Sequence, residues 1–191
     1  MSYEQTATER FGVSAPLVAL VDNGHTVVTG KIETSQAARV VTDLLYLDAD
    51  KPGSPVTIDI IDSPGGSVSA GFAILDTARR MKGTVSTIGY GMCASMAAVL
   101  LVCAGTPGNR YATENTTIML HQPSGMASGQ STDVTITANW LLRTRSSLEG
   151  LIASASGLSP EKVHDICERD TFLTAYEAQE LGLIDHVIES R

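Results

Sequence analysis

The stretch TVSTIGYGMCASMAAVLLVCA, residues 84–104, decides the fold that the sequence predicts. Its first part, TVSTIGY, is rich in β-branched and aromatic residues, which favours a buried strand. GMC then indicates a turn, and the small apolar residues from Ala94 to about Ala104 predict a helix. Ser95 falls in the first turn of that helix, where one hydroxyl interrupts an otherwise apolar run. Serine is an indifferent helix former and is costly to bury without a partner, so its presence needs a reason.

The same order of elements comes directly before this stretch. VTIDII, residues 56–61, predicts a buried strand, and SPGG at 63–66 predicts a glycine-rich turn. A helix is expected from about Val68 to Met81, and its apolar face carries Phe72, Ile74, Leu75 and Ala78. Strands that alternate with helices predict an α/β fold with mostly parallel strands, whose C-terminal ends usually meet the ligand.

Nearer the N-terminus, two apolar runs flank the turn signal DNGH. These runs, LVALV at 17–21 and TVVTGKI at 26–32, predict a hairpin or two short strands. Thr34 is the expected N-cap of a helix that Pro52 and its neighbours end. The expected apolar positions of that helix are Ala37, Ala38, Val41, Leu44, Leu45 and Leu47.

Beyond residue 104, TIMLH at 117–121 predicts a strand that ends in His121, followed by a glycine-dotted loop. A long helix is expected from Asp133 to about Ser156. Its candidate packed positions are Ile136, Trp140, Leu141, Leu148, Leu151 and Ile152.

The last part of the chain carries helix-capping signals and a closing strand. Ser159 and Pro160 predict the start of one helix, and Thr174 predicts the cap of a short one that Gly182 terminates. LIDHVI at 183–188 is expected as the final strand.

Length and composition restrict the class of protein. A chain of 191 residues predicts one domain spanning residues 1–191. The net charge of −8, from 13 basic and 21 acidic residues, argues against nucleic acid or anionic membranes as partners. The polar start lacks the order of a secretory signal, and the run 91–105 is shorter than the roughly 20 apolar residues of a membrane-spanning helix, so the expected location is cytoplasmic. Three cysteines without metal-type spacing predict buried, reduced thiols.

The spacing of polar residues at the predicted strand ends permits nucleophilic catalysis. A serine nucleophile needs a base, an acid that orients the base, and backbone donors for the developing oxyanion. Ser95 at a helix start is the candidate nucleophile, and the N–H of Met96 is a candidate donor because it has no intrahelical acceptor. His121 is the candidate base, and the SPGG turn can supply a second donor.

Each of these residues also has an ordinary structural explanation. Ser95 is also consistent with a small packing residue, and His121 with a satisfied polar side chain. Asp170, in ERDTF, is equally consistent with a solvated charge or an ion pair with Arg169. Cys93 is a rival nucleophile, although a small buried thiol is the expected state because no neighbour lowers its pKa.

Taken together, several segments resemble the proteolytic subunit of the Clp protease, the ClpP family of serine peptidases. The resemblance runs from about Val56 to Ile188. The segments that carry it are DSPGGSVSAGFAILDT, GYGMCASMAAVLL, TIMLHQPSG, GQSTDV and ERDTFLTAYEAQELGLIDHVI.

The resemblance implies a role for each residue at the matching positions. It implies Ser95 as nucleophile, His121 as base and Asp170 as orienting acid, with oxyanion hydrogen bonds from the N–H groups of Gly66 and Met96. It implies no cofactor and no metal. The same resemblance implies a crotonase-like spiral of ββα units with a projecting handle in the region of about 124–156.

The resemblance also implies an assembly and a partner. Family members stack two seven-membered rings through their handles, and an AAA+ unfoldase feeds them unfolded chains. Residues 1–16 are the expected axial segment. Trp140 is an interface candidate on the handle, and the strand before SPGG carries Ile58 and Ile60 where docking aromatics are common. Because the N-terminal third matches the family weakly, a mixed complex with a paralogue is a further expectation.

Two functions from other classes remain open at this point. One is a ring subunit that assembles but does not cut, or that needs a partner subunit to cut. The other is an acyl-CoA enzyme of the crotonase type, which shares the spiral fold and the oxyanion logic but needs no serine nucleophile.

Overall fold

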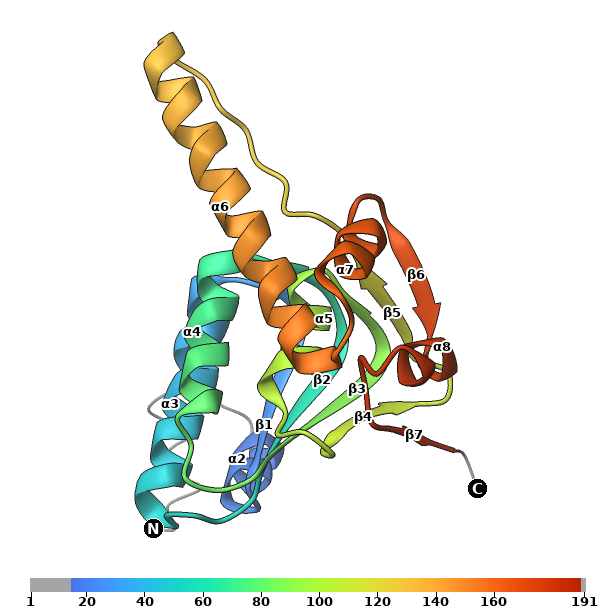
Figure 1. Ribbon diagram of the computed structural model, residues 1–191. Helices are drawn as coiled ribbons and strands as arrows, with labels where there is room; N and C mark the ends of the chain where they lie inside the picture. Colours follow the sequence, from blue (N-terminus) through green and yellow to red (C-terminus); the bar gives the residue numbers. More distant parts are fainter. Residues whose placement is uncertain (1–14, 190–191) are drawn as a thin grey trace.

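The computed structural model describes residues 15–189, so residues 1–14 of the expected axial segment lie outside the described part. Figure 1 shows a twisted sheet packed against helices, with one long helix that projects away from the rest. The elements in chain order are α2 (Ala15–Asp22), β1 (His25–Ile32), α3 (Thr34–Asp50), β2 (Val56–Gly66), α4 (Val68–Arg79), β3 (Val85–Ala94), α5 (Met96–Ala104), β4 (Arg110–Thr113), β5 (Thr117–Leu120), α6 (Ser131–Ser156), α7 (Pro160–Cys167), β6 (Thr171–Thr174), α8 (Ala175–Glu180) and β7 (His186–Ile188).

The predicted α/β class with mostly parallel strands is confirmed. Within residues 15–189 the seven strands form one sheet, in which β1, β2, β3, β4 and β7 are parallel neighbours in that order. The pair β5–β6 is antiparallel and joins the sheet through β3. Among the helices of residues 15–189, none combines the length and apolar character needed to cross a membrane.

Strand β3 pairs with two different strands on the same edge. Its first half, Thr87 to Gly89, pairs with β4, and its last residues, Met92 to Ala94, pair with β5. Gly91 lies between these two parts with a φ of 68°, a backbone conformation that glycine adopts without steric cost. The change of partner carries the end of β3 toward β5, so Ser95 emerges beside the strand that precedes His121.

Helix α5 is the centre of the core. All nine of its residues are buried, which explains why that segment is so rich in Ala, Val and Leu. A helix that is apolar on every side is stable only where other elements cover it completely. Strands β2 and β3 and helices α4 and α6 contact α5. Ile58 and Ile60 of β2 lie in this core with no exposed surface, so they cannot line a docking cleft on the surface.

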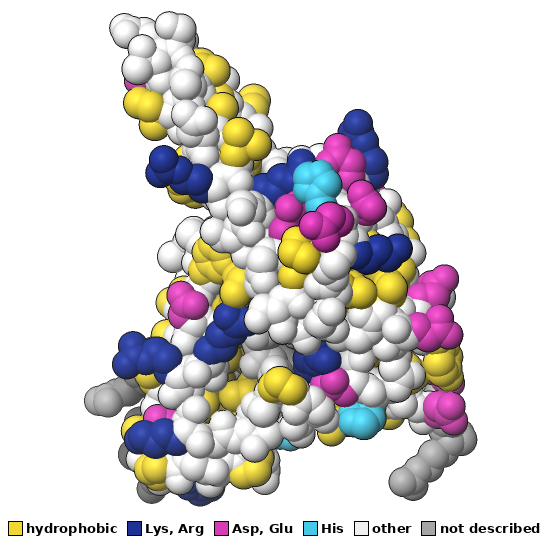
Figure 2. All heavy atoms as spheres, viewed as in Figure 1, with side chains coloured by type: hydrophobic (Ala, Val, Ile, Leu, Met, Phe, Trp, Pro, Cys, Tyr) yellow, Lys and Arg dark blue, Asp and Glu magenta, His cyan; other side chains and the backbone are white. Residues whose placement is uncertain are grey.

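Helix α6 projects from the body over its first half (Figure 1). Buried positions are confined to the second half, at Thr144, Leu148 and Ile152. Ile136 and Trp140, expected as packed positions, are instead 62% and 61% exposed, and both lie in the projecting half of the helix. Figure 2 shows hydrophobic side chains along this projection.

The predicted strand at residues 17–21 is wrong, since this segment is helix α2. Pro16 lies in its first turn, where a missing N–H costs nothing. Asn23 donates from its side chain to the Ala19 carbonyl at 2.7 Å, and Gly24 follows with a φ of 84°. The DNG segment is therefore a helix C-terminus and not a hairpin turn. The sequence signal does not distinguish the two, because both use a residue with positive φ.

The two glycine-rich turns expected at SPGG and GMC are also strand in the structure. Strand β2 continues to Gly66, where Lys31 and Ile32 of β1 pair with Gly65 and Gly66. Strand β3 likewise continues to Ala94. Both strands contain an irregularity, at Asp62 and Gly91, where φ is positive. The positive φ at these two residues marks a bend within each strand and not its end.

Helix boundaries were predicted closely, and two short strands were missed. Glu33, not Thr34, is the N-cap of α3, and α6 begins at Ser131. Leu45 of α3 is 59% exposed, whereas Leu44 and Leu47 are buried.

The capping predictions at Ser159 and Thr174 are confirmed by side-chain hydrogen bonds from the first-turn N–H groups. Strands β4 and β6, RYAT and TFLT, alternate in burial, but their apolar and polar residues do not alternate along the sequence.

A nearly buried ion pair anchors the C-terminal strand. The Arg110 side chain, 7% exposed, donates to Asp185 through Nη2 at 2.6 Å and through Nε at 2.8 Å. Asp185 also accepts the N–H of Gly108 at 2.9 Å. The hydrogen bonds from Arg110 hold the pKa of Asp185 below its ordinary value of 3.8.

Replacing this carboxylate should destabilise the fold in a pH-dependent way. Asp185→Asn is expected to lower the free energy of unfolding by roughly 2 kcal/mol at pH 7, because Arg110 then lacks its charged acceptor. The lowered pKa means that this stability is present above pH ~3.8 and is lost as the pH falls through the native pKa of Asp185. Urea unfolding between pH 7 and pH 3 measures the difference.

Asp165→Asn is the matched control, since Asp165 is an exposed carboxylate on α7. It should stay within about 0.5 kcal/mol of the wild type. A difference for Asp185→Asn that stays constant down to pH 3 would contradict an electrostatic origin.

Candidate active site

Ser95 connects strand β3 to helix α5 as the residue between them. It is the N-cap of α5, so the helix begins at Met96 and not at Ala94 as predicted. The Ser95 N–H donates to the Met119 carbonyl of β5 at 2.8 Å, and the Ser95 carbonyl accepts the Val99 N–H at 3.1 Å. The backbone of Ser95 is therefore held on both sides while its side chain stays partly exposed.

The backbone of Ser95 is strained. Its φ is 55° and its ψ is −123°, a combination that residues with a Cβ rarely adopt. Such conformations cost about 1–3 kcal/mol and persist only where the surrounding structure enforces them. A serine on a sharp strand-to-helix turn presents its hydroxyl outward, which is the geometry of a nucleophile elbow even though the GxSxG motif is absent.

His121 and Asp170 are brought together by the antiparallel pair β5–β6. Leu120 of β5 pairs with Thr171 of β6. His121 directly follows Leu120, and Asp170 directly precedes Thr171, so both leave the same end of the ladder. Residues 49 positions apart in sequence thus become neighbours because of strand register.

The three predicted residues form one chain of hydrogen bonds. His121 Nε2 lies 2.9 Å from Ser95 Oγ, and His121 Nδ1 lies 3.0 Å from Asp170 Oδ1. An ionised carboxylate only accepts hydrogen bonds, so Nδ1 carries the proton that is donated to Asp170. Nε2 of the neutral imidazole then accepts the Ser95 O–H, which is the arrangement a general base needs.

The structure disfavours both the alternative ion pair of Asp170 with Arg169 and the alternative nucleophile Cys93. In the described part of the chain, Asp170 pairs with His121 and not with Arg169. Burial raises the pKa of the Cys93 thiol to about 12, and its Sγ lies 3.7 Å from the Ile60 carbonyl inside the core. A thiol with this pKa is almost entirely protonated at neutral pH, so Cys93 is a poor rival to Ser95.

The two predicted backbone donors come from different elements. Met96 is the first residue of α5, where an N–H has no intrahelical acceptor. Gly66 ends β2, and a Cβ there would meet the Ile32 carbonyl oxygen at 2.3 Å. Gly65, which the sequence did not single out, makes the close approach to the serine: its Cβ would lie 2.7 Å from Ser95 Cβ and 2.8 Å from Met96 N.

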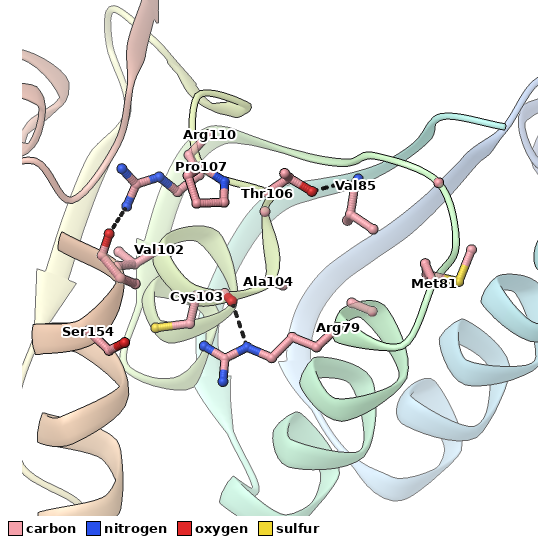
Figure 3. A pocket seen from close by; sticks show the side chains of 14 residues that line it. Arg79, Met81, Val85, Val102, Cys103, Ala104, Thr106, Pro107, Arg110 and Ser154 are labelled. Atoms are coloured by element: carbon pink, nitrogen blue, oxygen red, sulfur yellow. Dashed lines mark hydrogen bonds between the residues drawn. The ribbon is translucent and has the colours of Figure 1, made fainter. Parts of the chain in front are cut away.

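A separate cleft of about 300 Å³ opens where the C-terminal ends of α4, α5 and α6 meet (Figure 3). Arg79 donates to the Cys103 carbonyl at 3.2 Å, and Arg110 donates to the Ala155 carbonyl at 2.9 Å. Each arginine thus caps the last turn of a neighbouring helix. None of the residues that line this cleft belongs to the group of Ser95, His121 and Asp170.

Comparison with known families agrees with this fold. The family model described as Clp protease matches residues 12–191. This match covers nearly the whole chain, so the protein belongs to the Clp protease family, and the predicted membership is confirmed. Membership implies serine peptidase activity, and proteins of this family generally form oligomers and work with Clp ATPases.

Gly65→Ala should lower peptidase activity far more than the backbone strain of an alanine at this φ would by itself. The added Cβ would lie 2.6–2.8 Å from the backbone and Cβ atoms at residues 94–96 and so displace Ser95. Peptidase activity is expected to fall by about a hundredfold or more, since small displacements of reacting groups have large effects on rate. Hydrolysis of a fluorogenic peptide by the purified variant measures the loss.

Gly53→Ala isolates the effect of backbone strain alone. Gly53 has the same φ of 83° as Gly65, but a Cβ there would meet nothing within 4 Å. This control should lose about 1 kcal/mol of stability and keep its activity. Equal activities of the two variants would contradict the close packing of Gly65 against the serine.

Proposed function

We propose that the chain is the serine endopeptidase subunit of a chambered Clp-type protease, with Ser95 as nucleophile, His121 as general base and Asp170 as the orienting acid. The observation that carries the proposal is the continuous hydrogen-bonded chain Ser95–His121–Asp170, at 2.9 and 3.0 Å. The strained backbone of Ser95 supports it, because strain of this kind concentrates at functional residues.

In the proposed reaction, Ser95 Oγ attacks the carbonyl carbon of a peptide bond while His121 Nε2 takes the serine proton. The tetrahedral intermediate collapses, the C–N bond breaks, and His121 gives its proton to the departing amine. Water then attacks the acyl-serine ester, His121 takes a proton from that water, and the ester C–O bond breaks as Ser95 regains its proton. Asp170 keeps the imidazole in the correct tautomer and stabilises the imidazolium.

The backbone N–H groups of Gly66 and Met96 are the proposed donors to the oxyanion. Two donors at fixed positions stabilise charge that develops only in the transition state, which lowers the barrier without tightening substrate binding. Support comes from the position of Met96 at the start of α5 and from the close packing of the SPGG segment against residues 94–96.

The proposed assembly is two stacked heptameric rings, with the handle region of about 124–156 between them. The projecting half of α6 exposes Val134, Ile136, Trp140 and Leu142, an apolar surface that an isolated chain leaves in water. The proposed substrates are unfolded chains delivered by an AAA+ unfoldase in the cytoplasm. Any ATP hydrolysis belongs to that partner, and a paralogue in the same ring is compatible with this arrangement.

Two alternatives make different predictions. A non-catalytic ring subunit needs no alignment of Ser95 with His121, so the observed hydrogen bonds favour a subunit that cuts. A crotonase-type acyl-CoA enzyme would turn over a thioester without Ser95. Fluorophosphonate labelling of Ser95 and thioester turnover by Ser95→Ala together distinguish the three functions.

A serine-reactive fluorophosphonate should label Ser95, because its hydroxyl lies 2.9 Å from the imidazole Nε2 of His121, which can take the serine proton. Ser95→Ala is expected to abolish labelling. His121→Ala should lower kcat for a fluorogenic peptide by about a thousandfold or more, and Asp170→Asn by about a hundredfold or more. Mass-spectrometric mapping of the adduct together with steady-state kinetics measures both effects.

Cys93→Ala is the control for the rival thiol and should label at nearly the wild-type rate. If an assembled wild-type sample fails to label at Ser95, the catalytic proposal is wrong and the non-catalytic subunit is favoured. Full turnover of a thioester by Ser95→Ala would favour the crotonase-type function.

A further inference from the structure

A second group of polar side chains lies beside the candidate active site, between α6 and α7. Arg145 of α6 is its centre and is only 17% exposed. Its guanidinium donates to Glu149 at 2.7 Å through Nε, to Gln122 Oε1 at 2.9 Å through Nη1, and to Glu168 Oε2 at 2.7 Å through Nη2. His164 adds contacts to both Arg145 and Glu149 at the rim. Figure 2 shows charged side chains of both signs gathered near the base of the projecting helix.

Two of these partners belong to the segments that carry the proposed base and acid. Gln122 directly follows His121, and Glu168 lies two residues before Asp170. Gln122 Nε2 also donates to the Glu168 carbonyl at 2.9 Å, so the two segments are hydrogen-bonded to each other as well as to Arg145. The backbone pairing of β5 with β6 stops at Leu120 and Thr171. The side chains of Gln122 and Arg145 therefore continue the connection past the end of the ladder.

The catalytic contacts themselves are weakly restrained without this group. Asp170 is 62% exposed, and an exposed ion pair contributes little to stability. By contrast, the guanidinium presents several donors in a fixed plane, so it can restrain three partners at once. The hydrogen bond from Arg145 also holds the pKa of Glu168 below its ordinary value.

From this geometry we infer that Arg145 is a positioning residue for the peptidase reaction: by holding Gln122 and Glu168, it keeps His121 and Asp170 aligned with each other and with Ser95. The inference rests on the proposed function, since it assigns a role in the same reaction. Arg145 touches neither the substrate nor the reacting atoms. Its effect should therefore appear in the rate of the chemical step and disappear when the alignment is already lost.

The test compares Arg145→Ala and Arg145→Lys with Arg143→Ala, an exposed arginine two residues away on α6 that makes no ion pair within residues 15–189. For each variant, kcat and KM for a fluorogenic peptide and the rate of fluorophosphonate labelling at Ser95 are measured. Size-exclusion chromatography and thermal unfolding check that the assembly is intact. Gln122→Met is a second variant in case Arg145→Ala does not fold. It removes the hydrogen bond between Arg145 and the segment of His121 but leaves Arg145 paired with Glu149 and Glu168.

Arg145→Ala and Gln122→Met are expected to lower kcat and the labelling rate in parallel by about tenfold or more, with KM changed by less than about twofold. Arg145→Lys should recover only part of the rate, because an ammonium cannot reproduce the planar fork. In the Asp170→Asn background, Arg145→Ala should reduce the rate by less than about twofold further, because residues that act through one another are not additive.

Wild-type rates in folded Arg145→Ala and Gln122→Met would overturn the inference, as would a full additive loss in the Asp170→Asn background. A lower melting temperature with unchanged kcat would show a structural role only and would also overturn it. Failure of the wild-type protein to label at Ser95 is a different result, since it contradicts the proposed function itself.

Discussion

The pairing of β3 with two successive strands on one edge is the constraint on which the rest of the site depends. Strand β3 leaves β4 at Gly89 and joins β5 at Met92, with the positive φ of Gly91 between the two parts. This change of partner delivers Ser95 to β5, where the Met119 carbonyl accepts its N–H. Because β5 also carries the segment that leads into His121, the proposed nucleophile and the proposed base follow adjacent strands of one sheet.

The strain at Ser95 is possible because the helix behind it is immobilised. Every residue of α5 is buried, and a well-packed interior resists the displacement that would relieve the strained turn. Gly65 approaches from the other side, where a Cβ would overlap Ser95 and Met96. The serine hydroxyl is thus held by close packing of apolar and glycine residues, while the polar contacts at His121 and Asp170 lie nearer the solvent.

Helix α6 links the outer surface of the subunit with the candidate site. Its projecting half exposes Ile136 and Trp140, and its base holds Arg145 beside the segments of His121 and Asp170. One helix therefore carries both the apolar surface proposed for assembly and the side chain inferred to align Ser95, His121 and Asp170.

The sequence by itself determined the α/β class, the order of most helices and the identity of Ser95, His121 and Asp170 as candidates, because periodicity, caps and segment motifs are local properties. It did not determine that β3 changes partner at Gly91, or that SPGG extends a strand. The same glycine signal occurs in a turn, at a helix end and at a bend within a strand, because all three use a residue with positive φ. Only the tertiary structure brought residues 49 positions apart into hydrogen-bond contact and gathered Gln122, Arg145 and Glu168 beside them. Such contacts depend on strand register and on the packing of α6, which no short stretch of sequence encodes.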